Sequence, residues 1–500
     1  MGTKKLGPKV SLKSVLFHRR FDTVHRGDGC TIALDFGCLR RLQPRLQQIR
    51  ESELRMFMKK AVGATGVLAV TMLVSTPAQP QQQQQLSSLD RGRAQDMLRT
   101  VATEVRKHYF DPKFHGIDWD AKVSEAKQKI DKTTSMNMAL SHIAAALDTL
   151  GDSHTFFLPP RHADRLEYGV QYQMVGDRCF VSHVRPKSNA ESKGVKPGDQ
   201  ILTINTYDVN REDLWKVQYV FSILRPQPVL QLALQNPSGA QRQVEVPARI
   251  REGKKLTDVT WENGSNNFFD LVREGEQDRH LMRARLREYG DELMVLRIPE
   301  FDFSATEIAD MIGKARKHQG LIVDLRGNPG GAVETLRYLV GGVFDKEIKI
   351  ADRIGRKDTK PEVAKPLHNP FTGKLVVLVD ADSASASEVF ARIIQLEKRG
   401  VVIGDHSSGS VMESREYSEQ TGTETAIFYG ASITESNLIM SDGKSLEHVG
   451  VTPDEVLLPS AQDLADGRDP VLAHAAESLG VKITAEEAGK VFPYEWAPEN

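Results

Sequence analysis

The sequence predicts an α/β protein with an inserted small mixed domain and an N-terminal helical region. Three observations carry this prediction. Residues 291–460 alternate nearly continuous apolar runs with helical patterns, as in a sheet covered by helices on both faces. Residues 165–250 hold short β-rich runs separated by Gly and Pro. Between residues 94 and 150, apolar residues recur at helical spacing.

Length and charge bound the class of protein. A chain of 500 residues is expected to hold about three domains of roughly 150 residues each. Its 66 Lys+Arg and 67 Asp+Glu nearly balance, which argues against a polyanion binder. The balance is uneven, because residues 1–60 hold fourteen Lys/Arg and five Asp/Glu, so the remainder is acidic. No alternation of aromatic and basic residues occurs, and we expect no nucleic-acid partner.

The N-terminal part has the pattern of an export signal. Basic residues before position 61 are followed by fourteen uncharged, mostly apolar residues, Ala61 to Val74, and then by the small residues of 75–78. This run is shorter than the ~20 residues that span a bilayer, so we expect export to the periplasm or the extracellular space without an integral span in the mature chain. An uncleaved anchor and a buried helix are the alternatives. We divide this part into an extension of doubtful translation, a signal peptide and a polar linker: residues 1–57, 58–80 and 81–89.

The cysteine content predicts neither a disulfide bond nor a metal site in the mature chain. Cys30 and Cys38 fall in the doubtful extension, which leaves Cys179 alone in the mature chain. No internal disulfide can then form there. No Cys/His cluster with ligand spacing occurs, so we expect no metal and no cofactor.

The middle of the chain falls into two regions. Residues 90–164 form the helical region, which ends in the exposed-looking loop Gly151–Thr155. In 165–250, a short helix, Gly194, the turn Pro197-Gly-Asp199 and a strand ending at Asn205 resemble the PDZ domain. That resemblance implies capture of a chain end as an added strand. It assigns the carboxylate-binding loop to three consecutive residues: Tyr168, Gly169 and Val170.

The C-terminal half is expected to hold the α/β core. A charged segment, 251–290, is predicted as a helical connector, the core spans 291–460, and 461–500 is a tail. Core strands are expected at 293–298, 321–325, 375–380 and 401–403, and helices at 304–318, 331–343 and 386–398. Open α/β sheets place their sites at the carboxyl ends of the strands.

Two loops at such strand ends could carry chemistry. The segment Asp382–Glu388 places serines at a strand-to-helix turn, where free amides favour developing negative charge. Helix capping is the structural alternative. The segment Asp324–Gly331 follows another central strand, and its glycines let a backbone N–H approach a ligand closely. Taken alone, this second segment would be a tight turn.

Together the two motifs look like the core of the C-terminal-processing (tail-specific) serine peptidases, which also carry a PDZ domain before their core. The resemblance implies a Clp-protease/crotonase-like fold, polypeptide substrates and no cofactor. It makes Ser385 the nucleophile and assigns the oxyanion amides to Gly331 and Ala386. Arg326 and Asn328 take supporting roles, since Arg326 is expected to pair with a carboxylate and fix its loop.

The chain departs from that family at the base. The family lysine, twenty-five positions after the serine, falls on Ser410, and the family acid eleven positions after the serine falls on Leu396. Without a base a serine hydroxyl is a weak nucleophile. Tricorn-like members use a histidine from an earlier loop and a late glutamate.

The segments that resemble those of the tricorn-like members assign the base to His154, beside Ser153, and the acid to Glu447. Asp152 could serve as the acid or cap its own loop, and His154 could have a structural role. Other bases by residue type are His406, His448, Lys398 and Lys444.

The leading hypothesis is therefore an exported serine endopeptidase whose PDZ domain captures chain ends. The alternative is a catalytically retired PDZ-bearing scaffold that binds peptides, and a third hypothesis is another acyl transfer on the same fold. The sequence leaves the substrate and the oligomeric state open.

Overall fold

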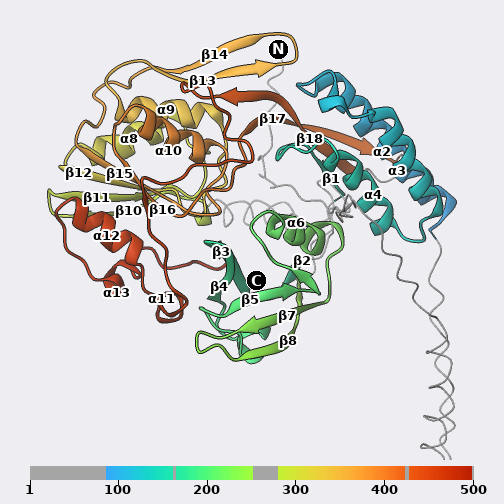
Figure 1. Cartoon of the computed structure of the whole chain (residues 1–500), viewed down its shortest axis with the longest axis horizontal. Coiled ribbons are helices and arrows are strands. Elements are labelled where there is room, and N and C mark those ends of the chain that lie inside the picture. Colours follow the sequence, from blue (N-terminus) through green and yellow to red (C-terminus); the bar gives the residue numbers. More distant parts are fainter. Residues whose placement is uncertain (1–85, 161–164, 252–279, 423–426, 498–500) are drawn as a thin grey trace, which may run out of the picture. The chain divides into compact units, whose positions relative to one another are not determined.

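The computed structural model describes residues 86–160, 165–251, 280–422 and 427–497 (Figure 1). The predicted extension and signal peptide lie outside the described residues. Within the described ranges, no helix combines the length and the apolar character that crossing a bilayer requires. The strands of these ranges form two six-stranded sheets, one five-stranded sheet and one pair.

The core sheet is mostly parallel. Its order is β10-β11-β12-β15-β16-β19, and only β10 runs antiparallel to its neighbour. The four strands predicted in the core are confirmed within two residues at each end. The bounds are β10 (Arg285–Tyr289), β11 (Leu293–Arg297), β12 (Gly320–Asp324), β15 (Lys374–Val379), β16 (Val401–Gly404) and β19 (Glu455–Val456).

Helices cover both faces of this sheet (Figure 1). Alternate residues of β11 point to opposite sides, so that Met294 and Leu296 join one core cluster while Leu293 and Val295 join another. This explains the continuous apolar runs in the sequence. One face carries α8 (Ala305–Ala315), α9 (Val333–Val343) and α10 (Ala386–Leu396), and the other α12 (Pro470–Ser478) and α13 (Ala485–Ala488).

Two segments differ from the prediction. The helical connector is wrong for residues 285–289, which form β10 at the edge of the core sheet. Its charged residues suit an edge strand, where they stay in water and discourage pairing with other chains. Beyond residue 460, the segment predicted only as a tail also contains α11 (Ala461–Asp466).

A five-stranded sheet was not predicted. Its order is β1-β18-β13-β14, with β17 paired to β18. The N-terminal helices pack against it and confirm the predicted helical region (Figure 1). The bounds are α2 (Ser88–His108), the 3₁₀ turn η2 (Phe114–Gly116), α3 (Trp119–Lys132), α4 (Met136–Asp148), β1 (Phe156–Leu158), β13 (Ile348–Gly355), β14 (Thr359–Ala364), β17 (Met412–Thr421) and β18 (Ile427–Ile439).

The small mixed domain holds a six-stranded antiparallel sheet of order β3-β4-β5-β7-β8, with β6 on β5. Its first strand, β3, lies at the edge of this order. The bounds are β2 (Arg165–Glu167), β3 (Val170–Val175), β4 (Arg178–Val184), α5 (Asn189–Ser192), β5 (Gln200–Ile204), β6 (Tyr207–Asp208), α6 (Leu214–Tyr219), the π-helical turn η3 (Val220–Leu224), β7 (Val229–Gln235), β8 (Gln241–Pro247) and β9 (Arg249–Arg251), which pairs with β2.

Candidate active site

Two loops meet at the carboxyl edge of the core sheet. Strands β12 and β15 are parallel neighbours, with Asp324 opposite Leu378, so the loops that follow them emerge side by side. The carbonyl of Asn328 in the first loop accepts hydrogen bonds from the Ala384 N–H and the Ser387 hydroxyl of the second, both at 3.0 Å. The two predicted motifs are therefore joined through Asn328, which is fully buried.

Ser385 sits at the sharp turn between β15 and α10. Its φ of 55° is one that residues with a side chain rarely adopt, and the surrounding contacts must hold it there. The Ser385 N–H donates to the Ser410 carbonyl at 2.9 Å and to the Glu388 carboxylate at 2.9 Å. The Ser385 side chain is only partly buried. This geometry presents a hydroxyl at the start of a helix, as a nucleophile requires.

Glu388 organises the floor of this turn. Its side chain is fully buried and accepts four hydrogen bonds, from the Ser385 and Ser410 N–H groups and from the Ser407 hydroxyl and the Gly409 N–H. Burial raises the pKa of Glu388 to about 7, against the effect of its hydrogen bonds. One carboxyl group therefore ties the Ser385 turn to the 407–410 loop.

Two backbone N–H groups of these loops are the oxyanion donors expected from the sequence. Among the described residues, neither the Gly331 N–H nor the Ala386 N–H donates to a protein acceptor. Gly330 has φ +93°, and a Cβ there would lie 2.7 Å from the Ser385 Cβ. Gly331 pairs with Phe301 through an isolated bridge. Glycine is thus required for the loop to approach the serine this closely.

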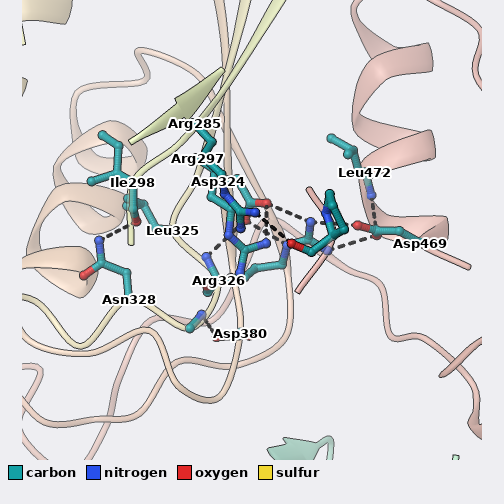
Figure 2. Close-up of polar contacts among 12 residues, drawn as sticks. Arg285, Arg297, Ile298, Asp324, Leu325, Arg326, Asn328, Asp380, Asp469 and Leu472 are labelled. Carbon is teal, nitrogen blue, oxygen red and sulfur yellow. Dashed lines mark hydrogen bonds and ion pairs between the residues drawn. The ribbon is translucent and has the colours of Figure 1, made fainter. Parts of the chain in front are cut away.

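A buried ion-pair network holds the same loop (Figure 2). The Arg326 guanidinium donates to both oxygens of Asp324, at 2.9 Å each, and to both oxygens of Asp469, at 2.9 and 2.8 Å. Burial alone would raise the pKa of Asp324, but the charges of Arg326 and Arg297 lower it to about 2. Asn328 donates to the Ile298 carbonyl at 2.7 Å (Figure 2) and accepts from the Gly330 N–H at 2.8 Å.

The histidine loop is tied to the late glutamate. The Ser153 hydroxyl lies 2.7 Å from His154 Nδ1 and donates to Glu447 Oε2 at 2.8 Å. The Ser153 N–H donates to Glu447 Oε1 at 2.6 Å. Asp152 instead accepts from the His154 and Thr155 N–H groups at 2.9 and 2.7 Å, so its carboxylate caps the loop.

Hydrogen bonds also connect the line of side chains from His154 through Ser153 to Glu447 with the Ser385 turn. Glu447 Oε2 also accepts from the Val411 N–H at 2.8 Å, and the preceding residue, Ser410, holds the Ser385 N–H. Burial raises the pKa of Glu447, while its hydrogen bonds and the nearby His448 oppose that rise. The structure thus brings Ser153, His154, Glu447 and the Ser385 turn into one hydrogen-bonded assembly.

Of the alternative bases, the two histidines have hydrogen-bond partners of their own and the two lysines are exposed. His448 Nε2 lies 2.8 Å from the Gly151 carbonyl, and His406 Nδ1 lies 3.3 Å from the Thr452 hydroxyl. Lys398 lies two residues beyond the end of α10, and Lys444 follows an exposed turn. Among these four, His448 Nε2 comes within 3.6 Å of Glu447 Oε1.

The predicted carboxylate-binding loop precedes the edge strand β3. The Tyr168 hydroxyl donates to the Gln227 carbonyl at 2.5 Å, which fixes this side chain across the domain. Gly169 has φ +76°, and a Cβ there would clash with Ser188. Val170 begins β3. The three residues thus lead directly into a strand edge.

Comparison with known proteins places this site in a family. Residues 292–457 match the model of peptidase family S41, and residues 161–219 match that of the PDZ domain. The core domain matches peptidase family S41 over nearly its whole length. Members of this family are serine-type peptidases, so by family the chain is a serine-type peptidase.

Individual relatives agree with this assignment. The tail-specific protease of Haemophilus influenzae is 27% identical over 285 residues, which cover 53% of this chain and 38% of that protein. The chloroplastic C-terminal processing peptidase of Tetradesmus obliquus is 26% identical over 402 residues, covering 77% of this chain and 79% of that protein. The crystal structure of mature CPAF, 17% identical, has the same fold with a TM-score of 0.58 over 80% of this chain and all of that one.

Two residues that hold the loops of this site, Glu388 and Asp469, had no role in the sequence analysis. Glu388 stands three residues after Ser385, which is the spacing of a capping box and could have revealed it. Asp469 lies 143 residues from Arg326 in a segment predicted as tail, and no local pattern indicates their pairing. Such partners follow from the fold alone.

Proposed function

We propose that this chain is a serine endopeptidase in which Ser385 is the nucleophile and His154 its base. The single observation that carries the proposal is the hydrogen-bonded line from His154 Nδ1 through Ser153 to Glu447, held next to the Ser385 turn. This line supplies a base in place of the family lysine, which is missing at position 410. A retired scaffold would have no need of a buried carboxylate aligned on a histidine.

The proposed chemistry follows acyl transfer. His154 Nε2 takes the proton of the Ser385 hydroxyl as its oxygen bonds to the scissile carbonyl carbon. The resulting oxyanion accepts hydrogen bonds from the Gly331 and Ala386 N–H groups. His154 then protonates the leaving amine as the C–N bond breaks and the acyl-enzyme forms. Water, deprotonated by the same ring, attacks this ester and releases Ser385.

The roles of the neighbouring groups follow from their contacts. Glu447 acts through Ser153 to orient His154 and to stabilise its cation, a longer version of the carboxylate–histidine pair. Arg326, Asn328 and Asp152 shape the two loops without touching the substrate. We assign them positioning roles.

Chain-end capture is the second part of the proposal. The loop 168–170 leads directly into β3. This strand lies at the edge of the described sheet and pairs there only with β4. An extended peptide can pair with such an edge while its terminal carboxylate meets loop N–H groups. Peptides with a free C-terminus should therefore have a lower KM than their amidated forms, and equal KM values would remove this part.

Export is the third part. It rests on the sequence pattern of residues 58–80, which lie outside the described residues. N-terminal sequencing of the natively expressed protein tests it. A start near residue 79 or later is expected, whereas peptides from residues 1–55 would contradict both the cleavage and the doubtful status of the extension.

Cleavage of an unfolded protein tests the catalytic assignment. Wild type should degrade it, while Ser385→Ala and His154→Ala should lose at least about 1,000-fold in rate. Labelling by a fluorophosphonate should disappear in the Ser385 variant. Equal rates in all three proteins would remove the assignment.

Matched controls separate the site from its surroundings. Ser408→Ala removes a hydroxyl from the adjacent loop, and His474→Ala removes an imidazole that pairs with Glu455 on the surface. Both should keep the wild-type rate within about threefold, since neither side chain joins the proposed line. A loss in the controls as large as in the Ser385 variant would show a general effect on folding instead.

A further inference from the structure

The sheet that carries β18 has a gap beside the histidine loop. On one side, β18 pairs with β1 through residues 430–432 and with β13 through residues 436–439. Between these two pairings, Thr434 has no strand partner on that side. It is nevertheless fully buried, so its polar groups require other partners.

The gap is filled by two segments of the N-terminal region. The Phe110 N–H donates to the Thr434 carbonyl at 2.9 Å, and the Thr434 N–H donates to the Thr155 hydroxyl at 3.0 Å. Thr155 is only 3% exposed. The Phe110 N–H and the Thr155 hydroxyl thus replace a missing strand, and Thr434 is the residue through which the histidine loop is attached to the sheet.

The hydrogen bonds of this fastening run in one direction. The Thr155 hydroxyl lies 3.1 Å from the Thr434 hydroxyl, which donates to Asp152 Oδ1 at 2.6 Å. A carboxylate oxygen accepts hydrogen bonds. The Thr434 hydroxyl therefore donates its hydrogen bond to Asp152 and accepts one from the Thr155 hydroxyl. Thr155 in turn accepts from the Thr434 N–H. Bonds aligned in this way polarise and strengthen one another.

The end of this chain is the carboxylate that shapes the loop. Asp152 Oδ1 accepts from the His154 and Thr155 N–H groups as well as from Thr434. The backbone of His154 is therefore fixed to β18 through Asp152 and Thr434. On its other side, the ring of His154 is bonded to Ser153.

We propose that the Thr434 hydroxyl is a positioning group for His154, acting through Asp152. The inference rests on the proposed function, since it takes His154 as the base. Thr434 touches neither substrate nor reacting atoms. Its role is to hold the histidine loop at the distance and angle that proton transfer from Ser385 needs, where a displacement of about 1 Å costs on the order of 100-fold in rate.

An isosteric pair of variants tests the role of the hydroxyl. Thr434→Val keeps the branched shape and removes the hydroxyl, and Thr434→Ser keeps the hydroxyl and removes the methyl. The valine variant should lose about 10- to 100-fold in kcat with KM within about twofold, because only the base is displaced. The serine variant should recover the rate to within about threefold of wild type.

Ser432→Ala is the matched control. Ser432 lies two residues earlier on the same strand, is equally buried at 3% exposure, and bonds the Ser414 hydroxyl instead of the loop. It should keep the wild-type kcat. A valine variant that keeps its rate, or one whose loss is equalled by Ser432→Ala, would overturn the inference while leaving the peptidase assignment intact.

Hydrogen exchange decides the inference even without turnover. The His154 and Thr155 amides should exchange about tenfold faster in Thr434→Val than in wild type, because their acceptor loses its anchor. Ser432→Ala should leave them unchanged. If wild type and Ser385→Ala are equally inactive, the proposed function fails, and unchanged amide exchange in Thr434→Val would separately refute the positioning role.

Discussion

Glu447→Gln is the perturbation that probes the proposed line most directly. The Glu447 side chain is 10% exposed, and its two oxygens accept three hydrogen bonds, from the Ser153 N–H and hydroxyl and from the Val411 N–H. Glutamine keeps the size but offers one acceptor oxygen and turns an N–H donor toward the others. The main loss is nevertheless the negative charge.

The size of that loss follows from the geometry. The two hydrogen bonds from His154 Nδ1 to Ser153 and from Ser153 to Glu447 Oε2 are 2.7 and 2.8 Å long, so the charges lie within about 5.5 Å. At an effective dielectric constant of ~20, this attraction is about 3 kcal/mol. It acts only when His154 is protonated, as in the transition state. We therefore expect kcat to fall roughly 100-fold with KM nearly unchanged.

Steady-state cleavage of an unfolded protein across pH measures this effect. Removing the anion disfavours the protonated imidazole, so the acid limb of the kcat/KM profile should move to lower pH. Glu413→Gln is the control, because this half-buried carboxylate pairs with Arg353 at 2.7 Å and not with the histidine loop. A Glu447→Gln enzyme within threefold of the wild-type kcat would refute the reasoning.

Four further substitutions, one of them a control, test the scaffold around Ser385. Gly330→Ala places a Cβ 2.7 Å from the Ser385 Cβ and should abolish fluorophosphonate labelling, whereas Gly327→Ala, with open space around its Cβ, should cost only about 1 kcal/mol of stability and keep labelling. Arg326→Met removes the hydrogen-bonded partner of the buried Asp324, leaves it only Arg297 at 3.6 Å, and should cost about 3–5 kcal/mol in urea unfolding. Because burial raises the pKa of Glu388 from 4.5 to about 7, the folded state binds more protons than the unfolded state between about pH 4.5 and 7, so about 3 kcal/mol of stability present below about pH 4.5 is lost as the pH rises to about 7. Glu388→Gln should remove that slope, and an unchanged slope would contradict the pKa.

The core could be predicted from the sequence because its signals are local. Continuous apolar runs identify buried parallel strands, and β12 and β15 appear where those runs occur. The glycines before position 332 indicate a close backbone approach, and the structure shows Gly330 against the Ser385 turn. The serine turn and the glycine loop could therefore be recognised as motifs in the sequence.

The five-stranded sheet could not be predicted in the same way. Strand β18 runs through the buried polar residues Ser432 and Thr434, whose hydroxyls bond Ser414 and Asp152, 18 and 282 residues away. A sequence pattern treats such residues as exposed. Edge strand β10 was mistaken for helix because its charges resemble a solvated helical face. In both cases long-range pairing, absent from any local window, decides the structure.

Position 410 keeps its backbone contacts to the Ser385 turn although it lacks the family lysine. The Ser410 carbonyl still holds the Ser385 N–H, and its own N–H still binds Glu388, so the backbone of this loop does its positioning work regardless of the side chain. The next residue, Val411, donates to Glu447. The loop that would carry the family lysine therefore instead anchors the carboxylate aligned on His154. The proposed role of Ser385 therefore does not require a lysine side chain at position 410, because the backbone of this loop makes the contacts to Ser385, Glu388 and Glu447.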